Sequence, residues 1–301
     1  MPAFITNQCP VCESHNYSVI GKADLGTIEL ANKPDKSEIV KCKNCKTIYV
    51  NPFPVWDIED FAILYNNDYF PPADNWTEMR EHVNTKRRFE RIKKFLDTTE
   101  NKNLLEFGAG IQAFMAKYLS KQGWKIDIQE PSEDFSKTLK EIYPQFTVIT
   151  SNFLDINTQK KYSLIYADSV LEHVHNPVEY IHKSAQMLSP GGILYLVFPH
   201  EHSLKNWGRT LLSKIKGNPV GYLAPYKNPY HLIGFSRKGI KIMAEKAGLQ
   251  LLKHIKCEDY EYFHFLNRKK GLLKYPVACI LYLADLIGWG TNQEIVLKKN
   301  K

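Results

Sequence analysis

Two pairs of cysteines near the start of the chain carry the clearest chemical signal in the sequence. Each pair has Cys-x-x-Cys spacing, and together they supply four thiolates: Cys9, Cys12, Cys42 and Cys45. Two such turns brought together form a closed tetrahedral sulfur site, which zinc prefers. Because four protein ligands leave no position for water, the pattern predicts structural zinc. The alternatives are two reduced turns that bind nothing, or a ribbon that reads nucleic acid.

A second signal is the glycine turn in residues 104–110, LLEFGAG, which follows a short apolar strand. Gly108 and Gly110 let the backbone approach a ligand, and the helix that follows directs its N–H groups toward it. Glu130 closes the next strand, where a carboxylate can accept both hydroxyl protons of a ribose. The arrangement predicts a binding site for an adenosine cofactor.

Two positions distinguish between the candidate cofactors. The dinucleotide fingerprint has a third glycine where this chain has Ala113, and alanine is small enough to leave a nicotinamide cofactor open. Glu106 precedes the glycines at a position that is usually apolar in dinucleotide folds. A carboxylate there suits a cationic ligand such as the amino acid end of S-adenosylmethionine, which we therefore favour.

The elements that position these residues follow from hydrophobic periodicity. Strands are predicted at 103–107, 125–129, 146–149, 163–167, 192–198, 249–256 and 293–298, and helices at 76–96, 111–122, 133–142 and 176–188. Alternation of this kind is typical of an α/β fold, with a parallel sheet covered by helices on both faces.

The motifs resemble those of class I S-adenosylmethionine-dependent methyltransferases in order and spacing. Residues 104–110, 130–132 (EPS), 168–173 (DSVLEH) and 188–192 (LSPGG) carry the resemblance, which covers roughly 80–300. Upstream, the cysteine pairs, residues 50–54 (VNPFP) and residues 64–70 (LYNNDYF) look like the subgroup with an N-terminal zinc ribbon, common in polysaccharide and deoxysugar biosynthesis.

The resemblance implies a Rossmann-like, seven-stranded methyltransferase sheet with a small zinc-ribbon module. It implies a zinc ribbon at 1–50, a connector and helical cap at 51–98, and an S-adenosylmethionine-binding domain at 99–301. The implied cofactor contacts are Glu106, Gly108 and Gly110 at the methionine end, Glu130 and Pro131 at the ribose, Asn152 and Phe153 at the adenine, and Asp168 and Ser169 at the sulfonium. Gln112 departs from the family pattern, which often has a small residue there.

An acceptor that loses a proton during methyl transfer needs a base, and histidine titrates near working pH. His173 follows the fourth strand, and His231 lies in a His-x-x-x-Phe-Ser stretch that the subgroup shares. We expect His231 to be the base, although Tyr230 stands where sugar C-methyltransferases have an acid. Tyr65 is a candidate to close over the site; core packing accounts for each of these residues equally well.

Composition sets further expectations. The chain of 301 residues has a formal net charge of +8, which suits an anionic acceptor. With no signal peptide in view, we expect a cytoplasmic protein whose remaining cysteines, Cys257 and Cys279, are reduced core residues. Residues 276–289 are apolar but too short to span a bilayer, so they predict a buried helix or, alternatively, a peripheral membrane contact.

The expected function is methyl transfer from S-adenosylmethionine to a sugar, nucleotide sugar or phosphorylated small molecule in cell-surface polysaccharide biosynthesis. One alternative is a methyltransferase directed to RNA, or a zinc-ribbon protein that binds nucleic acid. The chain lacks the Asn/Asp-Pro-Pro-Tyr/Phe-type motif that base-amino methyltransferases often carry, so nucleic acid is the less favoured partner. Another alternative is a methyltransferase-like scaffold that has lost activity, for which Gln112 is the motive.

Overall fold

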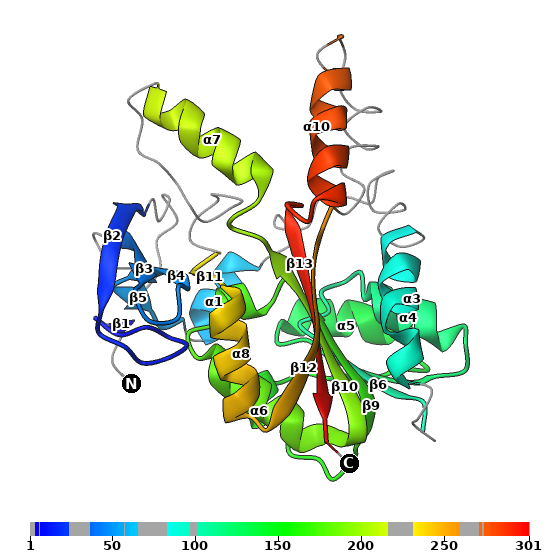
Figure 1. Cartoon of the computed structure of the whole chain (residues 1–301). Coiled ribbons are helices and arrows are strands. Elements are labelled where there is room, and N and C mark those ends of the chain that lie inside the picture. Colours follow the sequence, from blue (N-terminus) through cyan, green and yellow to red (C-terminus); the bar gives the residue numbers. More distant parts are fainter. Residues whose placement is uncertain are drawn as a thin grey trace.

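A seven-stranded sheet with helices on both faces forms the centre of the molecule (Figure 1). The computed structural model describes residues 4–5, 7–23, 37–56, 58–65, 83–96, 101–215, 231–258, 271–272 and 274–300. The strand order is β8-β7-β6-β9-β10-β13-β12, and the seven strands match the number that the resemblance implies. The strands are β6 (Asn103–Phe107), β7 (Lys125–Gln129), β8 (Thr147–Ile149), β9 (Tyr162–Asp168), β10 (Leu188–Pro199), β12 (Leu249–Cys257) and β13 (Asn292–Lys299).

The sheet is parallel, as expected, except for one strand, which makes it mixed. All pairs from β8 to β10 are parallel, whereas β13 pairs antiparallel with both β10 and β12. The chain leaves β12 at Cys257 and re-enters the sheet at Asn292, its partner in the register. Because β13 starts at the edge where β12 ends, it has to run in the opposite direction.

Two layers of helices cover the sheet, and alternate residues of each strand face one layer or the other. Leu105, Ile165 and Leu194 belong to the core cluster that contains side chains of α6 (Pro177–Met187) and α8 (Arg237–Lys246). Leu104, Leu164 and Ile193 belong to the cluster under α3 (Thr85–Leu96), α4 (Phe114–Ser120) and α5 (Glu133–Ile142). The alternation confirms a sheet buried on both faces.

Two predicted helices differ from the structure at their starts. The helix expected at 111–122 begins only at Phe114, because Ala113 has a left-handed backbone with φ of +38° and extends the turn. The helix expected at 76–96 is described from Thr85 onward, and residues 83–84 before it are π-helical. Residues 76–82 lie outside the described part of the chain.

A second, four-stranded sheet carries the cysteines. Its order is β11-β4-β3-β2, with β2 at Tyr17–Lys22, β3 at Glu38–Cys42, β4 at Ile48–Asn51 and β11 at Ile233–Gly234. The edge strand β11 therefore comes from far along the chain, and it pairs antiparallel with β4. Nearby lie the short pair β1 (Phe4–Ile5) and β5 (Phe53–Pro54), and helix α1 (Ile58–Leu64). The buried side chains of this sheet belong to the same core cluster as α6 and α8.

Two further helices extend from the body of the molecule. They are α7 (Leu204–Ile215) and α10 (Lys274–Leu286), and both project beyond the end of the large sheet at the top of Figure 1. In the part of the chain that the structure describes, neither these nor any other helix has the length and apolarity needed to cross a membrane.

Candidate active site and metal centre

The glycine turn after β6 is fixed against the end of β7. Gly108 and Gly110 have φ of +60° and +56°, in the left-handed region that favours glycine. A Cβ atom at Gly108 would lie 2.6 Å from a methyl carbon of Val170, so the space also requires glycine. The Gly108 N–H lies 2.9 Å from the backbone oxygen of Gln129 and 3.1 Å from its side-chain oxygen.

Glu130 lies beside this turn, as the sequence predicts. Its carboxylate accepts the N–H of Gly110 at 2.8 Å and the N–H of Ser132 at 3.0 Å. Burial raises the pKa of Glu130, while these two backbone donors lower it. The structure thus brings Gly108, Gly110 and Glu130 together, with the half-buried Pro131 between Glu130 and Ser132.

Glu106 is buried in β6, and its side chain is directed at the backbone of α4. Its carboxylate accepts the N–H of Ala116 at 2.6 Å. Burial raises the pKa of Glu106 to about 8, and the nearby charge of Asp168 adds to the effect. A carboxyl group with a raised pKa ionises more readily when a cation binds beside it, because the positive charge lowers that pKa.

Asp168 ends β9 and forms an ion pair that the sequence did not predict. Its Oδ2 accepts the Nη1 of Arg88, from α3, at 2.5 Å, and its Oδ1 accepts the hydroxyl of Ser169 at 3.2 Å. Arg88 belongs to the basic run at 86–88, a pattern typical of a solvated helix face, but it is only 3% exposed. The missed signal is its spacing, since Arg88 lies in the same helical stripe as the buried Phe89 and Ile92.

The residues expected at the adenine are packed differently from each other. Asn152 caps the short 3-10 helix Phe153–Asp155, where its side-chain oxygen accepts the N–H of Leu154 at 3.0 Å and lies 3.3 Å from the Tyr180 hydroxyl. The Phe153 ring is fully buried and stacks on Phe107 with 4.1 Å between centroids. A contact between Phe153 and adenine stays a prediction.

The three residues predicted for catalysis lie together. The rings of His173 and His231 meet edge to face with 4.7 Å between centroids, and Tyr65 meets His173 at 5.8 Å. His173 belongs to the 3-10 helix Leu171–His173 that follows β9, and His231 lies just before β11. The N–H of Leu232 donates to the backbone oxygen of Glu172 at 2.8 Å, which ties the two segments.

Glu172 completes this cluster, although the sequence pointed only to its neighbour. It is 1% exposed, and neither carboxylate oxygen has a hydrogen-bond partner among the described residues. Its Oε1 lies 3.7 Å from the Nε2 of His173, and burial raises the pKa of Glu172 well above its usual value. The donor atoms of Glu172, His173 and His231 all lie within 4.8 Å of one another. Such a set can hold a proton or a divalent cation.

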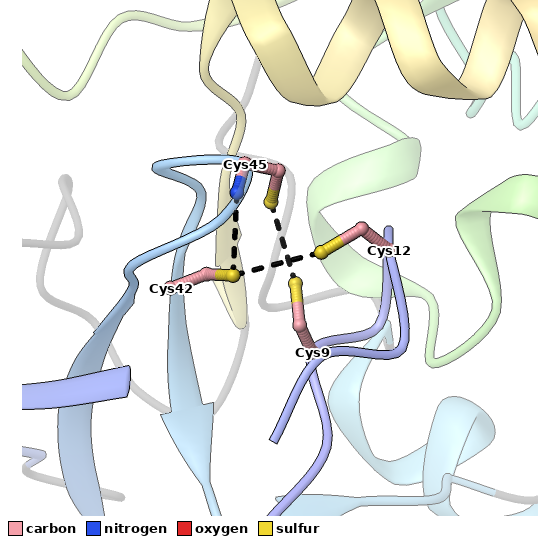
Figure 2. Close-up of side chains that lie close together, drawn as sticks. All are labelled: Cys9, Cys12, Cys42 and Cys45. Atoms are coloured by element: carbon pink, nitrogen blue, oxygen red, sulfur yellow. Dashed lines mark hydrogen bonds between the residues drawn. The ribbon is translucent and has the colours of Figure 1, made fainter. Parts of the chain in front are cut away.

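Figure 2 shows the four cysteine side chains converging from two turns. The sulfurs of Cys9 and Cys45 are 3.5 Å apart, and those of Cys12 and Cys42 are 3.6 Å apart. In a tetrahedral site with Zn–S bonds of about 2.3 Å, sulfurs lie about 3.8 Å from one another, so the arrangement fits zinc. The hydrogen bond with Cys45 and burial raise the pKa of the Cys9 thiol. A bound cation would lower that pKa, because it stabilises the thiolate.

The other two cysteines differ from each other. Cys257 is buried, where its thiol donates to Glu294 at 3.2 Å and accepts from Arg91 at 3.3 Å. Cys279 is exposed on α10, so the expectation of a core residue is wrong there.

Comparison with known proteins gives a family and a fold. The family model described as "Methyltransferase domain" matches residues 79–254. A ubiquinone biosynthesis O-methyltransferase of Hydrogenovibrio crunogenus is 26% identical over 171 residues, which are 54% of this chain and 68% of that protein.

Two solved structures share the fold at low identity. One is assigned provisionally as a sarcosine dimethylglycine methyltransferase of Galdieria sulphuraria; it has a TM-score of 0.50 and 17% identity, over 72% of this chain and 85% of that chain. The other belongs to a complex of the Trm112 methyltransferase activator of Haloferax volcanii with a methyltransferase assigned in the same provisional way. It has a TM-score of 0.50 and 11% identity, over 77% of this chain and 100% of that chain.

Proposed function

Because the chain belongs to the methyltransferase domain family and is a class I S-adenosylmethionine-dependent methyltransferase, we propose that it methylates a small anionic acceptor. The proposed acceptor is a sugar, nucleotide sugar or phosphorylated small molecule in cell-surface polysaccharide biosynthesis. The zinc-ribbon resemblance supports the pathway, and the net charge of +8 supports an anionic acceptor. The name of the curated relative, an O-methyltransferase, favours a hydroxyl as the accepting group.

The single observation that carries the proposal is the proximity of two groups of residues at neighbouring strand ends. Gly108, Gly110 and Glu130 meet after β6 and β7, and the Glu172, His173 and His231 cluster follows β9, the strand beside β6. In parallel sheets of this kind, ligands bind at the carboxyl ends of the strands. Cofactor and acceptor sites at this edge would be adjacent.

The proposed cofactor contacts follow the predicted assignments. Glu106 would balance the ammonium of the methionine end beside Gly108 and Gly110, and Glu130 with Pro131 would hold the ribose. Asn152 and Phe153 would border the adenine, and Asp168 with Ser169 would line the sulfonium side. Arg88 keeps the Asp168 carboxylate in place by a 2.5 Å ion pair.

The proposed chemistry at the cluster is removal of a proton. S-adenosylmethionine, when bound, supplies a methyl group activated by its sulfonium. His231 would accept the proton of the acceptor hydroxyl as that oxygen bonds to the methyl carbon and the bond from this carbon to sulfur breaks, which would leave S-adenosylhomocysteine as the second product. Glu172, buried near both imidazoles, would act as a positioning residue and stabilise the charge that the histidine gains. His173 and Tyr65 would orient the loop and cover the site.

We also propose that Cys9, Cys12, Cys42 and Cys45 hold structural zinc. The module at 1–50 would then be a zinc ribbon, followed by the connector and cap at 51–98 and the cofactor domain at 99–301. Structural zinc contributes about 10–16 kcal/mol in small zinc modules, which suits a module with so small a core of its own. Metal analysis of the purified protein tests this assignment, and one zinc per chain is expected.

The function is tested by titration calorimetry followed by a methyl-transfer screen. We expect heat with both S-adenosylmethionine and S-adenosylhomocysteine, and transfer to an anionic sugar nucleotide or phosphorylated precursor. RNA serves as the competing acceptor. Transfer to RNA alone would overturn the proposed acceptor class. Cofactor binding without transfer to any acceptor, with transfer gained on Gln112→Gly, would favour the inactive scaffold.

The base is tested by His231→Ala. We expect kcat to fall about 10²–10⁴-fold, which is the usual contribution of a general base, with the Kd for S-adenosylmethionine unchanged. His182→Ala, at an exposed position on α6, is the matched control and should retain full activity.

A chelator separates the base from a metal site in the same cluster. Protein stripped of metal with EDTA and then reloaded with one equivalent of Zn²⁺ should recover full turnover if His231 takes the proton itself. Turnover that Zn²⁺ does not restore but Mg²⁺ or Mn²⁺ does, ions that favour oxygen ligands over thiolates, would contradict the assignment of His231 as the base.

A further inference from the structure

Helix α7 presents an apolar face that no described residue covers. Trp207, Leu211, Leu212 and Ile215 are 62%, 45%, 58% and 73% exposed. Their spacing of four, five and eight residues from Trp207 puts them on one side of the helix. Single exposed apolar residues are common on protein surfaces, but a contiguous set of this size marks an interaction surface.

Helix α10 is exposed around most of its circumference. Only a narrow stripe, Ala278, Leu281 and Ala284, is buried against the rest of the molecule. The remaining large apolar side chains of the helix and of the turn that follows it are exposed: Tyr275, Val277, Ile280, Tyr282, Leu283, Leu286, Ile287 and Trp289. The expectation that residues 276–289 form a buried helix is therefore wrong.

The charged residues of these two helices are basic, apart from one acid. Asp285 is the only acid of α10, and it is directed inward, where it pairs with Arg87 at 3.1 Å and accepts the N–H of Glu258 at 2.8 Å. Lys274 begins α10, with its ammonium 5.2 Å from the Tyr275 ring centroid. The sequence of α7 contains Lys205, Arg209 and Lys214 and no acid.

We infer that α7 and α10 together form a surface that inserts into the interfacial region of an anionic lipid bilayer. Apolar side chains enter the boundary of the acyl chains, tryptophan and tyrosine side chains lie at the headgroup level, and lysines meet the anionic headgroups. Both helices project from the same end of the molecule, so one membrane can contact both (Figure 1).

Charge favours a bilayer over a second copy of the chain as the occupant of this surface. In a symmetric dimer the same patch of each copy comes together, so the two copies would bring the net positive charge of α7 and of the start of α10 close to the same charge of the partner. Anionic headgroups instead complement that charge. The inference goes beyond the proposed function and stands whether or not the acceptor is the one proposed.

Vesicle flotation of the full-length protein tests the inference. We expect wild type to float with phosphatidylcholine vesicles that contain phosphatidylglycerol, and to bind pure phosphatidylcholine at least tenfold more weakly. Ile280→Glu with Leu283→Glu, and separately Leu212→Glu with Ile215→Glu, should each reduce binding at least tenfold. Val19→Glu with Ile142→Glu is the control, because these side chains are 53% and 55% exposed on distant elements.

The exposed thiol of Cys279 offers a second readout that does not depend on a disruptive variant. A polarity-sensitive fluorophore attached there should shift to the blue with anionic vesicles, and Cys279→Ser should take up no label. Unaltered cofactor binding and circular dichroism would show that the charged variants fold. No flotation, no spectral shift, or a wild-type dimer in sedimentation that Ile280→Glu with Leu283→Glu separates would each overturn the inference.

Discussion

At the scale of single residues, the candidate site is dominated by three buried carboxyl groups. Glu106, Glu130 and Glu172 are each at most 5% exposed, and burial raises the pKa of all three. Buried carboxyl groups with raised pKa values are common in functional sites. There a bound cation or a reacting group can stabilise the negative charge that the carboxyl group gains when it loses its proton.

The pKa of Glu106 has a direct consequence for stability. Its value of about 8, against an ordinary 4.5, means that the folded chain binds more protons than the unfolded chain between these pH values. The free energy of unfolding should therefore fall as pH rises from about 4.5 to about 8, by up to about 1.4 kcal/mol per pH unit from this residue. Urea unfolding of wild type and Glu106→Gln across this range measures the difference.

Glu106→Gln is isosteric, so it should keep the fold while removing this part of the pH dependence. The difference in unfolding free energy between the two proteins should change steadily up to about pH 8 and then level off. A difference that is constant with pH would show that Glu106 ionises normally in the folded protein.

At the scale of elements, α3 does more than cover one face of the sheet. It carries Arg88 to Asp168 and Arg91 to Glu294, and Glu294 also accepts the hydroxyl of Tyr195 at 2.7 Å. The positive charge of Arg91 lowers the pKa of Glu294 against the effect of burial. Through Arg88, this helix therefore holds Asp168 in position at the end of β9.

Removing one partner of a buried ion pair leaves the other charge uncompensated. Arg88→Met should lower the free energy of unfolding by about 3–5 kcal/mol. Arg87→Met is the control from the same helix; the Arg87 side chain is 25% exposed, against 4% for Arg88, so a loss of about 1 kcal/mol or less is expected. Denaturant unfolding gives both values, and equal losses would contradict the special role of Arg88.

Local periodicity was sufficient for most elements and insufficient for contacts between distant ones. The strand from 103 to 107 and the glycine turn follow from patterns within a dozen residues, and the structure confirms the fold class. Arg88 and Glu172 were missed because their roles depend on which segments meet in space. The reversed direction of β13 also depends on how the chain returns to the sheet after β12, which no local pattern encodes.

At the scale of the whole molecule, the segment that contains His231 connects the candidate active site with the four-stranded sheet. The N–H of Leu232 donates to the backbone oxygen of Glu172, which follows β9, and the carbonyl of Leu232 accepts the N–H of Val50, in β4, at 3.1 Å. The Ser236 hydroxyl donates to the backbone oxygen of Cys45. The position of the proposed base therefore depends on the integrity of the cysteine centre.

Loss of the metal should reduce turnover without abolishing cofactor binding. In Cys45→Ser, or after removal of zinc with a strong chelator, we expect a lower Tm and a kcat reduced at least tenfold. The Kd for S-adenosylmethionine should change less than threefold. Hydrogen exchange at the amides of Val50 and Leu232 should accelerate. Cys279→Ser, at an exposed position, should change none of these. An unaltered kcat in zinc-free folded protein would contradict the coupling.

The origin of β11 also determines when the cysteine module can be finished during synthesis. The four cysteines leave the ribosome early, but Ile233 and Gly234, which complete the sheet beside β4, are made only after most of the chain. Until then β4 is an open edge strand, and such edges pair readily with other chains. Nascent chains should accordingly be most prone to aggregation in the interval between translation of the second cysteine pair and translation of residue 234.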